Sequence, residues 1–325
     1  MHVGGTSATG RAVTAALNGC SLAFKAVAYA HLRCKERRAT AVPDTRIISV
    51  GNLAFGGTGK TALIIDLGAF LERRGVKFAV ITRGYRSFLE RQGGEVLAAH
   101  STRDVGDEAK LLKRRFPAQN VFVGRDRHRS IQRALAKDNR VLILDDGFQS
   151  QDIHQDWPIL LIDPDQPYYY LRHFYFLMRR ARSVFFFRTV PPRFRNFSSG
   201  TYSFAIEGFF DRDGRIVDIA AAGRFAAFAG LGNNRRFQQD LTAFHPAGFR
   251  EYPDHHRYTA TDVRSLNDWG REMGASCLVC TEKDFVKVAE LAWPGLPFIY
   301  ARNRIELSVD LFTQIAEHVQ AEGIL

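Results

Sequence analysis

Cysteine is scarce in this sequence, with four among 325 residues: Cys20, Cys34, Cys277 and Cys280. Such a low number excludes the disulfide-dense scaffolds of small secreted proteins and fits a reducing, cytosolic setting. Cys277 and Cys280 form one C-x-x-C, but no second cysteine or histidine pair follows at the spacing of a zinc site. We therefore interpret "SCLVCTEKD" as a buried strand and its exit, and we predict no zinc.

Acidic residues are also few. Lys plus Arg number 45 against 34 for Asp plus Glu, which gives a formal net charge of +11. This excess indicates an anionic partner: nucleic acid, acidic lipid or a phosphorylated substrate. The aromatic content of 12% favours lipid or a stacked ligand among these. With 46% hydrophobic residues, the chain can bury a large core, and its length predicts two lobes.

The sequence lacks a clean membrane-spanning run. The stretch 12–32 is mostly apolar but contains Asn18 and Lys25, and a Lys near the centre of a span costs roughly 2.5–3.5 kcal/mol. Its apolar residues recur at helical spacing, so we predict an amphipathic helix within residues 1–38. That helix would lie on a membrane surface, with "RCKERR" on anionic headgroups. A core helix and a signal peptide are the alternatives. The phosphate-binding loop described next argues against a signal peptide, because export would take that loop to a compartment without ATP.

The stretch "SVGNLAFGGTGKT" ends as a phosphate-binding loop does, but the first glycine of G-x-x-x-x-G-K-[ST] is missing. Ala54 stands there. Lys60 would still reach the β- and γ-phosphates, and Thr61 would bind Mg²⁺. Four residues could turn backbone N–H groups toward a phosphate at the start of the next helix: Gly56, Gly57, Thr58 and Gly59. We predict a nucleotide site, and a glycine-rich turn without a ligand is the alternative.

Strand-like and helix-like segments alternate after this loop, which is typical of a parallel sheet with crossover helices. The run "RVLILDDGFQ" predicts a strand that ends in Asp145 and Asp146, where an acidic group can join a Mg²⁺ shell. A surface turn "DDG" is the alternative reading. We expect a P-loop lobe over 39–200 and a smaller α/β lobe over 201–325. The second lobe would open with a hairpin turning at Asp213–Gly214 and would contain a capped helix starting at Thr259.

The absence of a guanine-recognition motif narrows the kind of phosphate chemistry that the sequence predicts. A guanine-specific switch needs N-K-x-D, and the nearest string, "TEKD", has lysine and aspartate adjacent. A kinase needs a base near its acceptor hydroxyl. Asp107 in "DVGDEAKLL" and His255 in "YPDHHRY" are candidates. Either could instead be structural, Asp107 as a helix cap and His255 as a loop histidine.

Seven motifs then occur in the order seen in the tetraacyldisaccharide 4'-kinases, which the chain resembles from about Arg46 to about Lys287: "ISVGNLAFGGTGKT", "TRGY", "DVGDEA", "LDDGFQ", "AGLGNNRRF", "YPDHHRYT" and "TEKD". The family also lacks the first Walker glycine. The resemblance implies transfer of the ATP γ-phosphate to the 4'-hydroxyl of a tetraacyldisaccharide 1-phosphate, giving lipid IVA in lipid A biosynthesis. It implies ATP and Mg²⁺, a lipid disaccharide substrate, and a peripheral place on the anionic cytoplasmic face of the bacterial inner membrane.

The resemblance also implies roles for single residues. Lys60 and Thr61 would hold the phosphates and Mg²⁺, with the acids after "VLIL" as further metal ligands: Asp145 and Asp146. Asp107 resembles the base that takes the sugar hydroxyl's proton, and His255 resembles its partner. Gln149 matches a family position with a general nucleotide or substrate role.

One segment departs from the family. After "LLIDPD" the chain reads "QPYYYLRHFYFLMRRARSVFFFRT" and lacks the acid expected there. This puts one metal or substrate contact in doubt. Residues 171–182 could be an aromatic and basic face for lipid, or the aromatics could be core residues with "SVFFF" as a buried strand.

Two other functions remain open on the sequence. One is a P-loop ATPase or GTPase acting as a switch or metallochaperone on a protein partner, against which stands the absence of N-K-x-D and of a His/Cys-rich tract. The other is a nucleic-acid-binding ATPase, which would explain the charge but not the apolar N-terminal stretch. We therefore expect a lipid kinase with no nucleic-acid partner.

Overall fold

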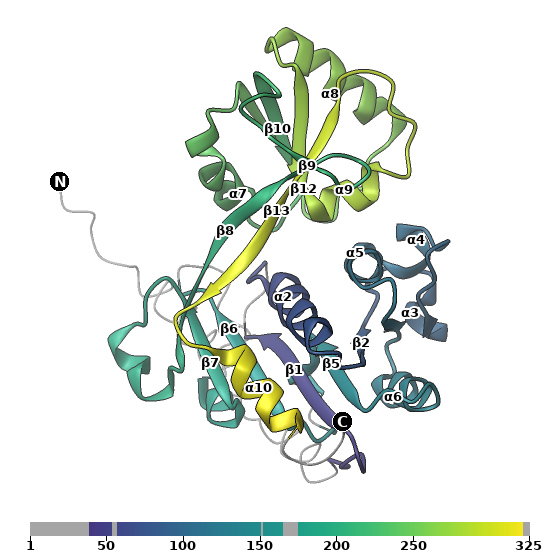
Figure 1. Ribbon diagram of the computed structural model, residues 1–325, viewed down its shortest axis with the longest axis vertical. Helices are drawn as coiled ribbons and strands as arrows, with labels where there is room; N and C mark the ends of the chain where they lie inside the picture. The colour runs from purple at the N-terminus through teal and green to yellow at the C-terminus, as the bar shows by residue number, and fades with distance from the viewer. Residues whose placement is uncertain (1–38, 54–56, 151, 165–174, 321–325) are drawn as a thin grey trace, which may run out of the picture.

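The computed structural model of the protein describes residues 39–53, 57–150, 152–164 and 175–320. The helix predicted within residues 1–38 lies outside this part of the chain. Among the described residues, no helix is long and apolar enough to cross a bilayer. The chain folds as α/β with one mixed, mostly parallel sheet that continues through both lobes (Figure 1).

The strands follow each other across the sheet in the order β11-β10-β12-β13-β8-β7-β6-β1-β5-β2-β4-β3, and β9 pairs with β8. The first lobe contains β1 (Arg46–Asn52), α2 (Lys60–Arg73), β2 (Phe78–Thr82), α3 (Leu89–Gln92), β3 (Gly94–Glu95), α4 (Thr102–Val105), α5 (Asp107–Arg115), β4 (Asn120–Val123), α6 (Arg127–Leu135), β5 (Val141–Asp145), η1 (Gly147–Gln149), β6 (Trp157–Ile162), η3 (Tyr175–Arg180), β7 (Ser183–Phe187) and η4 (Pro192–Phe197). There follow β8 (Gly200–Phe210), β9 (Ile216–Val217), β10 (Phe225–Ala229), α7 (Asn234–Asp240), η5 (Thr242–Phe244), β11 (Gly248–Glu251), α8 (Ala260–Glu272), β12 (Cys277–Thr281), α9 (Glu282–Val288), β13 (Phe298–Leu307) and α10 (Leu311–Gln320).

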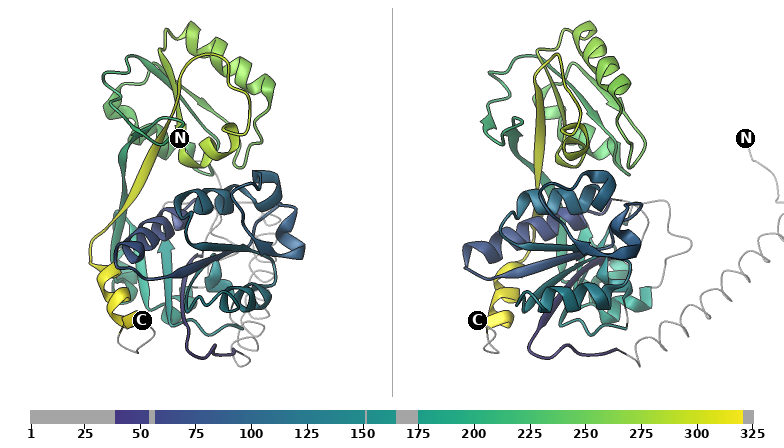
Figure 2. Two further views of the ribbon diagram at one scale, coloured as in Figure 1. Left: turned by 45° about the vertical axis from the view of Figure 1, so that its right-hand side comes forward. Right: turned by 90° about the vertical axis from the view of Figure 1, so that its right-hand side faces the viewer.

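Helices cover both faces of the first-lobe sheet (Figure 2). Successive strand residues point to opposite faces, so each apolar strand feeds two cores. Ile48 and Val80 pack with α2 and α5, whereas their neighbours Ile47 and Ile81 pack with α6. The continuous apolar runs of the sequence are therefore buried strands, as predicted, and α2 and α5 share one face of the sheet.

Two long strands connect the lobes. β8 starts parallel to β7, with Gly200 opposite Phe185, and then pairs antiparallel with β13 up to the level of Tyr300 and Phe210. Figure 1 shows this pair running from the lower lobe to the upper one. An 11-residue strand spans about 35 Å, enough to reach from one lobe into the next.

The end of the chain differs from the expectation that 201–325 forms only the smaller lobe. β13 runs back toward the first lobe, and α10 then packs beside α2 and β6, where the His318 and Trp157 ring centroids are 5.4 Å apart. The reason is the antiparallel partnership of β13 with β8, which returns the chain to its starting lobe. The pattern of residues within α10 does not predict that this helix packs on the first lobe.

Several local predictions for the second lobe are confirmed. The β8–β9 hairpin turns at Asp213–Gly214, where Gly214 has φ +82°. Thr259 caps α8 in a capping box with Asp262. Cys277 and Cys280 lie on β12 and both are buried, so the predicted buried strand is present. In the first lobe, "SVFFF" forms the largely buried strand β7, as one of the two interpretations of this segment expected.

Candidate active site

The motifs meet at one edge of the sheet. β1, β5 and β2 are parallel neighbours, so their carboxyl ends lie together. The phosphate-binding loop follows β1, Asp145 and Asp146 follow β5, and "TRGY" follows β2. In open α/β sheets this edge is where ligands bind. The strand order therefore brings together motifs that are up to about a hundred residues apart in sequence.

The end of the phosphate-binding loop is held tightly. Gly59 adopts φ +91°, and a Cβ there would lie 2.1 Å from Cζ of Phe204 on β8, so both conformation and space require glycine. Asn52 Nδ2 donates to Thr58 Oγ1 over 3.2 Å at the other end of the loop. Lys60 is the first residue of α2, so the loop ends at a helix N-terminus that favours anions. Of the four predicted nest residues, Gly57, Thr58 and Gly59 are described; Gly56 lies outside the described residues.

The acidic pair is suited to a hard cation. Asp145 is 5% exposed and accepts a hydrogen bond from Thr82 Oγ1 at 2.9 Å. Burial, reinforced by the charge of Glu108, raises the pKa of Asp145 to about 6. Asp146 Oδ1 is buried and accepts no hydrogen bond from the described residues, and it lies 3.6 Å from Lys60 Nζ.

Oxygen ligands of this kind fit Mg²⁺. The second residue of α2, Thr61, adds a hydroxyl at the same loop end. Thr61, Asp145 and Asp146 together could hold the ion, because a divalent cation would compensate the burial of Asp145 and supply a partner for the unsatisfied oxygen of Asp146.

Asp107 and His255 are brought together across the two lobes. His255 Nδ1 lies 3.0 Å from Asp107 Oδ2, although 148 positions separate them in sequence. Asp107 opens α5 directly after Gly106, whose φ of +89° turns the chain into the helix. His255 itself has φ +57°, a conformation that costs a non-glycine residue energy and is frequent at functional sites.

Electrostatics favour the ionised form of this pair. The hydrogen bond to Asp107 raises the pKa of His255 above its ordinary value, despite partial burial. Burial alone would raise the pKa of Asp107, but the charge of Lys283 and the hydrogen bond with His255 outweigh it and hold that pKa well below its usual range. Asp107 is thus a carboxylate at neutral pH, ready to accept a hydrogen bond from a hydroxyl.

Sequence reasoning missed several polar side chains at this edge. Arg236, on α7 of the second lobe, donates through Nη2 to the Gly57 carbonyl at 3.1 Å and to Asp163 Oδ2 at 3.2 Å. Arg127 Nη2 donates to the Asp145 carbonyl at 2.6 Å. Two of these residues carried a sequence signal: Asp163 directly follows the strand "WPILLI", where functional acids collect, and Arg236 lies within the motif "AGLGNNRRF".

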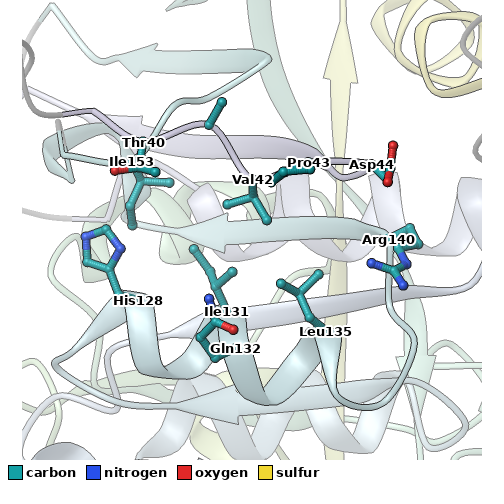
Figure 3. Close-up of a pocket in the computed structure, with 11 residues that line it drawn as sticks. Thr40, Val42, Pro43, Asp44, His128, Ile131, Gln132, Leu135, Arg140 and Ile153 are labelled. Carbon is teal, nitrogen blue, oxygen red and sulfur yellow. The ribbon is translucent and has the colours of Figure 1, made fainter.

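One further group of residues lies at this site, and one pocket lies away from it. Ligand atoms of Asp107, Glu108 and His255 lie within 4.8 Å of one another in the described part of the chain, but the Lys283 ammonium already stands 3.0 Å from Glu108 Oε1. A pocket of about 450 Å³ lies between segment 40–44 and α6 (Figure 3). None of the residues that line this pocket belongs to the site described above.

Comparison with known proteins agrees with the geometry. Residues 13–173 and 198–320 match the family model described as tetraacyldisaccharide-1-P 4'-kinase. The tetraacyldisaccharide 4'-kinase of Syntrophus aciditrophicus (strain SB) is 31% identical over 78% of this chain and 78% of its own. That of Bradyrhizobium sp. (strain BTAi1) is 29% identical over 84% of this chain and 80% of its own. An LpxK structure from Aquifex aeolicus, solved in complex with ATP, shares the fold with a TM-score of 0.73, at 23% identity over 94% of this chain and 99% of that one.

Proposed function

The chain belongs to the tetraacyldisaccharide-1-P 4'-kinase family, and we propose that it transfers the γ-phosphate of ATP to the 4'-hydroxyl of a tetraacyldisaccharide 1-phosphate. The product would be lipid IVA, in the lipid A pathway. The observation that carries the proposal is the Asp107–His255 pair, because it puts an ionised carboxylate, suited to act as the base, at the start of α5 and close to the acidic edge of the phosphate site. Glu108, the next residue, is near enough to raise the pKa of Asp145 by its charge.

In this mechanism the phosphate end of the site works by charge and position. The triphosphate would be bound by the side chain of Lys60, by the loop amides of Gly57 to Gly59 and by the N-terminus of α2. Thr61, Asp145 and Asp146 would hold Mg²⁺, and the ion would supply positive charge that offsets the charge of the triphosphate. Gln149 ends η1, the turn that directly follows the acidic pair, and its proposed role is a general one toward the nucleotide or the substrate.

At the other end, Asp107 accepts the proton of the sugar hydroxyl while His255 holds the carboxylate in place. The lowered pKa makes Asp107 a weak base. That is sufficient for a loose phosphoryl transfer, in which the attacking hydroxyl gains acidity only as its bond to phosphorus forms. We therefore assign Asp107 an orienting role together with late proton acceptance.

The first test is a phosphorylation assay with ATP, Mg²⁺ and the lipid disaccharide acceptor in mixed micelles. Asp107→Ala should retain ATP binding and lower kcat by roughly 10²–10⁴-fold, the usual contribution of a general base. Asp104→Asn is a matched control, because Asp104 also lies at a helix start but contacts Ser101 instead of His255. Turnover of Asp107→Ala at the wild-type rate would reject the base. ATP hydrolysis that is indifferent to the lipid would instead favour a switch ATPase.

We further propose that residues 1–38 attach the enzyme peripherally to the anionic cytoplasmic face of the inner membrane. Residues 39–200 together with the returning helix α10 would form the phosphate-binding lobe, and the part of 201–325 before α10 would complete the active site. The support is the apolar and basic composition of the N-terminal stretch and the +11 net charge. Deleting residues 1–38 should abolish binding to vesicles with anionic lipid while ATP binding persists. Equal vesicle binding by the truncated and full chains would reject this attachment.

A further inference from the structure

The "TEKD" motif forms the junction between β12 and α9. Thr281 ends the strand and caps the helix, and its Oγ1 accepts a hydrogen bond from the Asp284 amide at 3.0 Å. The completely buried Asp284 accepts from the Gly230 amide at 3.0 Å and from the Tyr258 hydroxyl at 3.1 Å. Lys287 Nζ lies 2.7 Å from the same carboxylate. Asp284 thus ties the start of α9 to two loops of the second lobe.

This anchoring fixes where the neighbouring side chain points. Lys283 Nζ leaves α9 toward α5 of the first lobe, where it lies 3.0 Å from Glu108 Oε1 and 3.8 Å from Asp107 Oδ2. Helices α9 and α5 pack against each other in this region. The buried hydrogen-bond network of Asp284 therefore fixes the start of α9, and the Lys283 side chain extends from there to Asp107, the proposed base.

We propose that Lys283 is the positioning residue for the base. Its ammonium shields the adjacent carboxylates of Asp107 and Glu108 from solvent and orients Asp107 toward the acceptor hydroxyl. This inference rests on the proposed role of Asp107. Two carboxylates side by side at a helix start repel each other, and His255 contacts only one of them. The single group that bridges both is Lys283, within the described residues.

The charges that face Asp107 come from three elements. α5 contributes Glu108, α9 contributes Lys283 and the more distant Lys287, and the loop before α8 contributes His255 with Asp254 beside it. Without Lys283, burial and Glu108 would oppose ionisation of Asp107, with His255 left as its nearest cation. The pH below which activity falls should then rise, because Asp107 must be ionised to accept the proton.

The experiment compares Lys283→Met and Lys283→Arg with wild type, with kcat and KM measured across the pH range for both substrates. We expect Lys283→Met to lower kcat at least roughly tenfold and to move the acidic limb of the profile to higher pH, as loss of a base's supporting charge does. KM for ATP should change less than about twofold, since Lys283 contacts no phosphate-loop residue in the described structure. Lys283→Arg should restore most of kcat.

Glu282→Gln is the matched control. Glu282 precedes Lys283 on α9 and also reaches the first lobe, where it lies 3.5 Å from Arg115 Nη1, but it does not contact Asp107. Equal losses in Glu282→Gln and Lys283→Met, or a wild-type acidic limb in Lys283→Met, would overturn the proposal. Glu108→Gln is a second test that does not depend on the folding of the lysine variants. It should also reduce kcat, but by a smaller factor than Lys283→Met. A wild-type protein without lipid kinase activity would refute the proposed function itself.

Discussion

Asp66 offers a direct test of how the phosphate-loop helix is attached to the strand that joins the lobes. It lies on α2, half-buried, and its Oδ2 accepts a hydrogen bond from the Ile305 amide of β13 at 2.7 Å. Burial raises the pKa of Asp66 to about 6 from an ordinary value of 3.8, and that hydrogen bond only partly opposes the effect. The ionised carboxylate of Asp66 therefore destabilises the folded state at neutral pH, although its hydrogen bond with the Ile305 amide joins α2 to β13.

The size and sign of this effect follow from the two pKa values. A rise from 3.8 to about 6 means that the folded state binds more protons than the unfolded state between these pH values. The free energy of unfolding therefore increases as pH falls through 6 and stops increasing below about 3.8. At about 1.36 kcal/mol per pKa unit, ionised Asp66 costs the folded protein up to roughly 3 kcal/mol at pH 8. Solvent screening at this half-buried site makes the figure an upper value.

Asp66→Asn keeps an oxygen acceptor for the Ile305 amide and removes the charge. It should raise the free energy of unfolding at pH 8 by up to about 3 kcal/mol and show little gain at pH 4, where wild-type Asp66 is largely protonated. The assay is urea unfolding followed by circular dichroism at both pH values. Asp268→Asn on the exposed side of α8 is the control and should change neither value appreciably. A destabilised Asp66→Asn at pH 8 would refute the reasoning.

Three other outcomes follow from the site. Gly59→Ala should abolish ATP binding and lower the free energy of unfolding by about 2–4 kcal/mol, because it combines a positive φ with a clash against Phe204. Gly57→Ala should lower the free energy of unfolding far less, because a Cβ there would meet nothing within 4 Å. Calorimetric titration with ATP and a thermal unfolding scan distinguish the two variants. Arg236→Ala should weaken ATP binding roughly tenfold by releasing the Gly57 carbonyl, with Asp163→Asn showing the same direction, and unchanged ATP affinity in both would show that this contact does not support the loop. His255→Ala should lower kcat with little change in ATP affinity, as measured by steady-state kinetics, and an equal rise in KM for ATP would contradict its placement on the acceptor side.

The sequence predicted the architecture of the first lobe well because its signals are local. Apolar runs that end in glycine or aspartate mark buried parallel strands, and "GGTGKT" marks the start of a helix. Residues 46–52 and 141–145 form strands, and the loop between 52 and 60 leads into α2, as expected. The hairpin, the α8 cap and the buried cysteines were likewise readable, because each depends on neighbours within a few positions.

The contacts between the lobes were not readable, because they join residues that no periodicity links. Lys283 reaches Glu108 across 175 positions, and Arg236 reaches Gly57 across 179. The resemblance suggested the partnership of Asp107 with His255, but neither local pattern distinguished a base from a helix cap. The return of α10 to the first lobe depends on the direction of β13, which is set by its pairing with β8. Long-range pairing is a property of the assembled sheet.

A common electrostatic plan connects these long-range contacts. The first lobe supplies carboxylates at the inter-lobe surface and the second supplies cations or a histidine for them: Asp107, Glu108 and Asp163 meet His255, Lys283 and Arg236. Complementary charge fixes the register of two apposed surfaces more than it adds affinity. One pair, Arg115 with Glu282, runs the other way, so a simple shift of one lobe along the other would bring like charges together. The Asp107–His255 contact and the Arg236 contact with the phosphate-binding loop thus depend on the same apposition, so the proposed reaction would need the second lobe as well as the first.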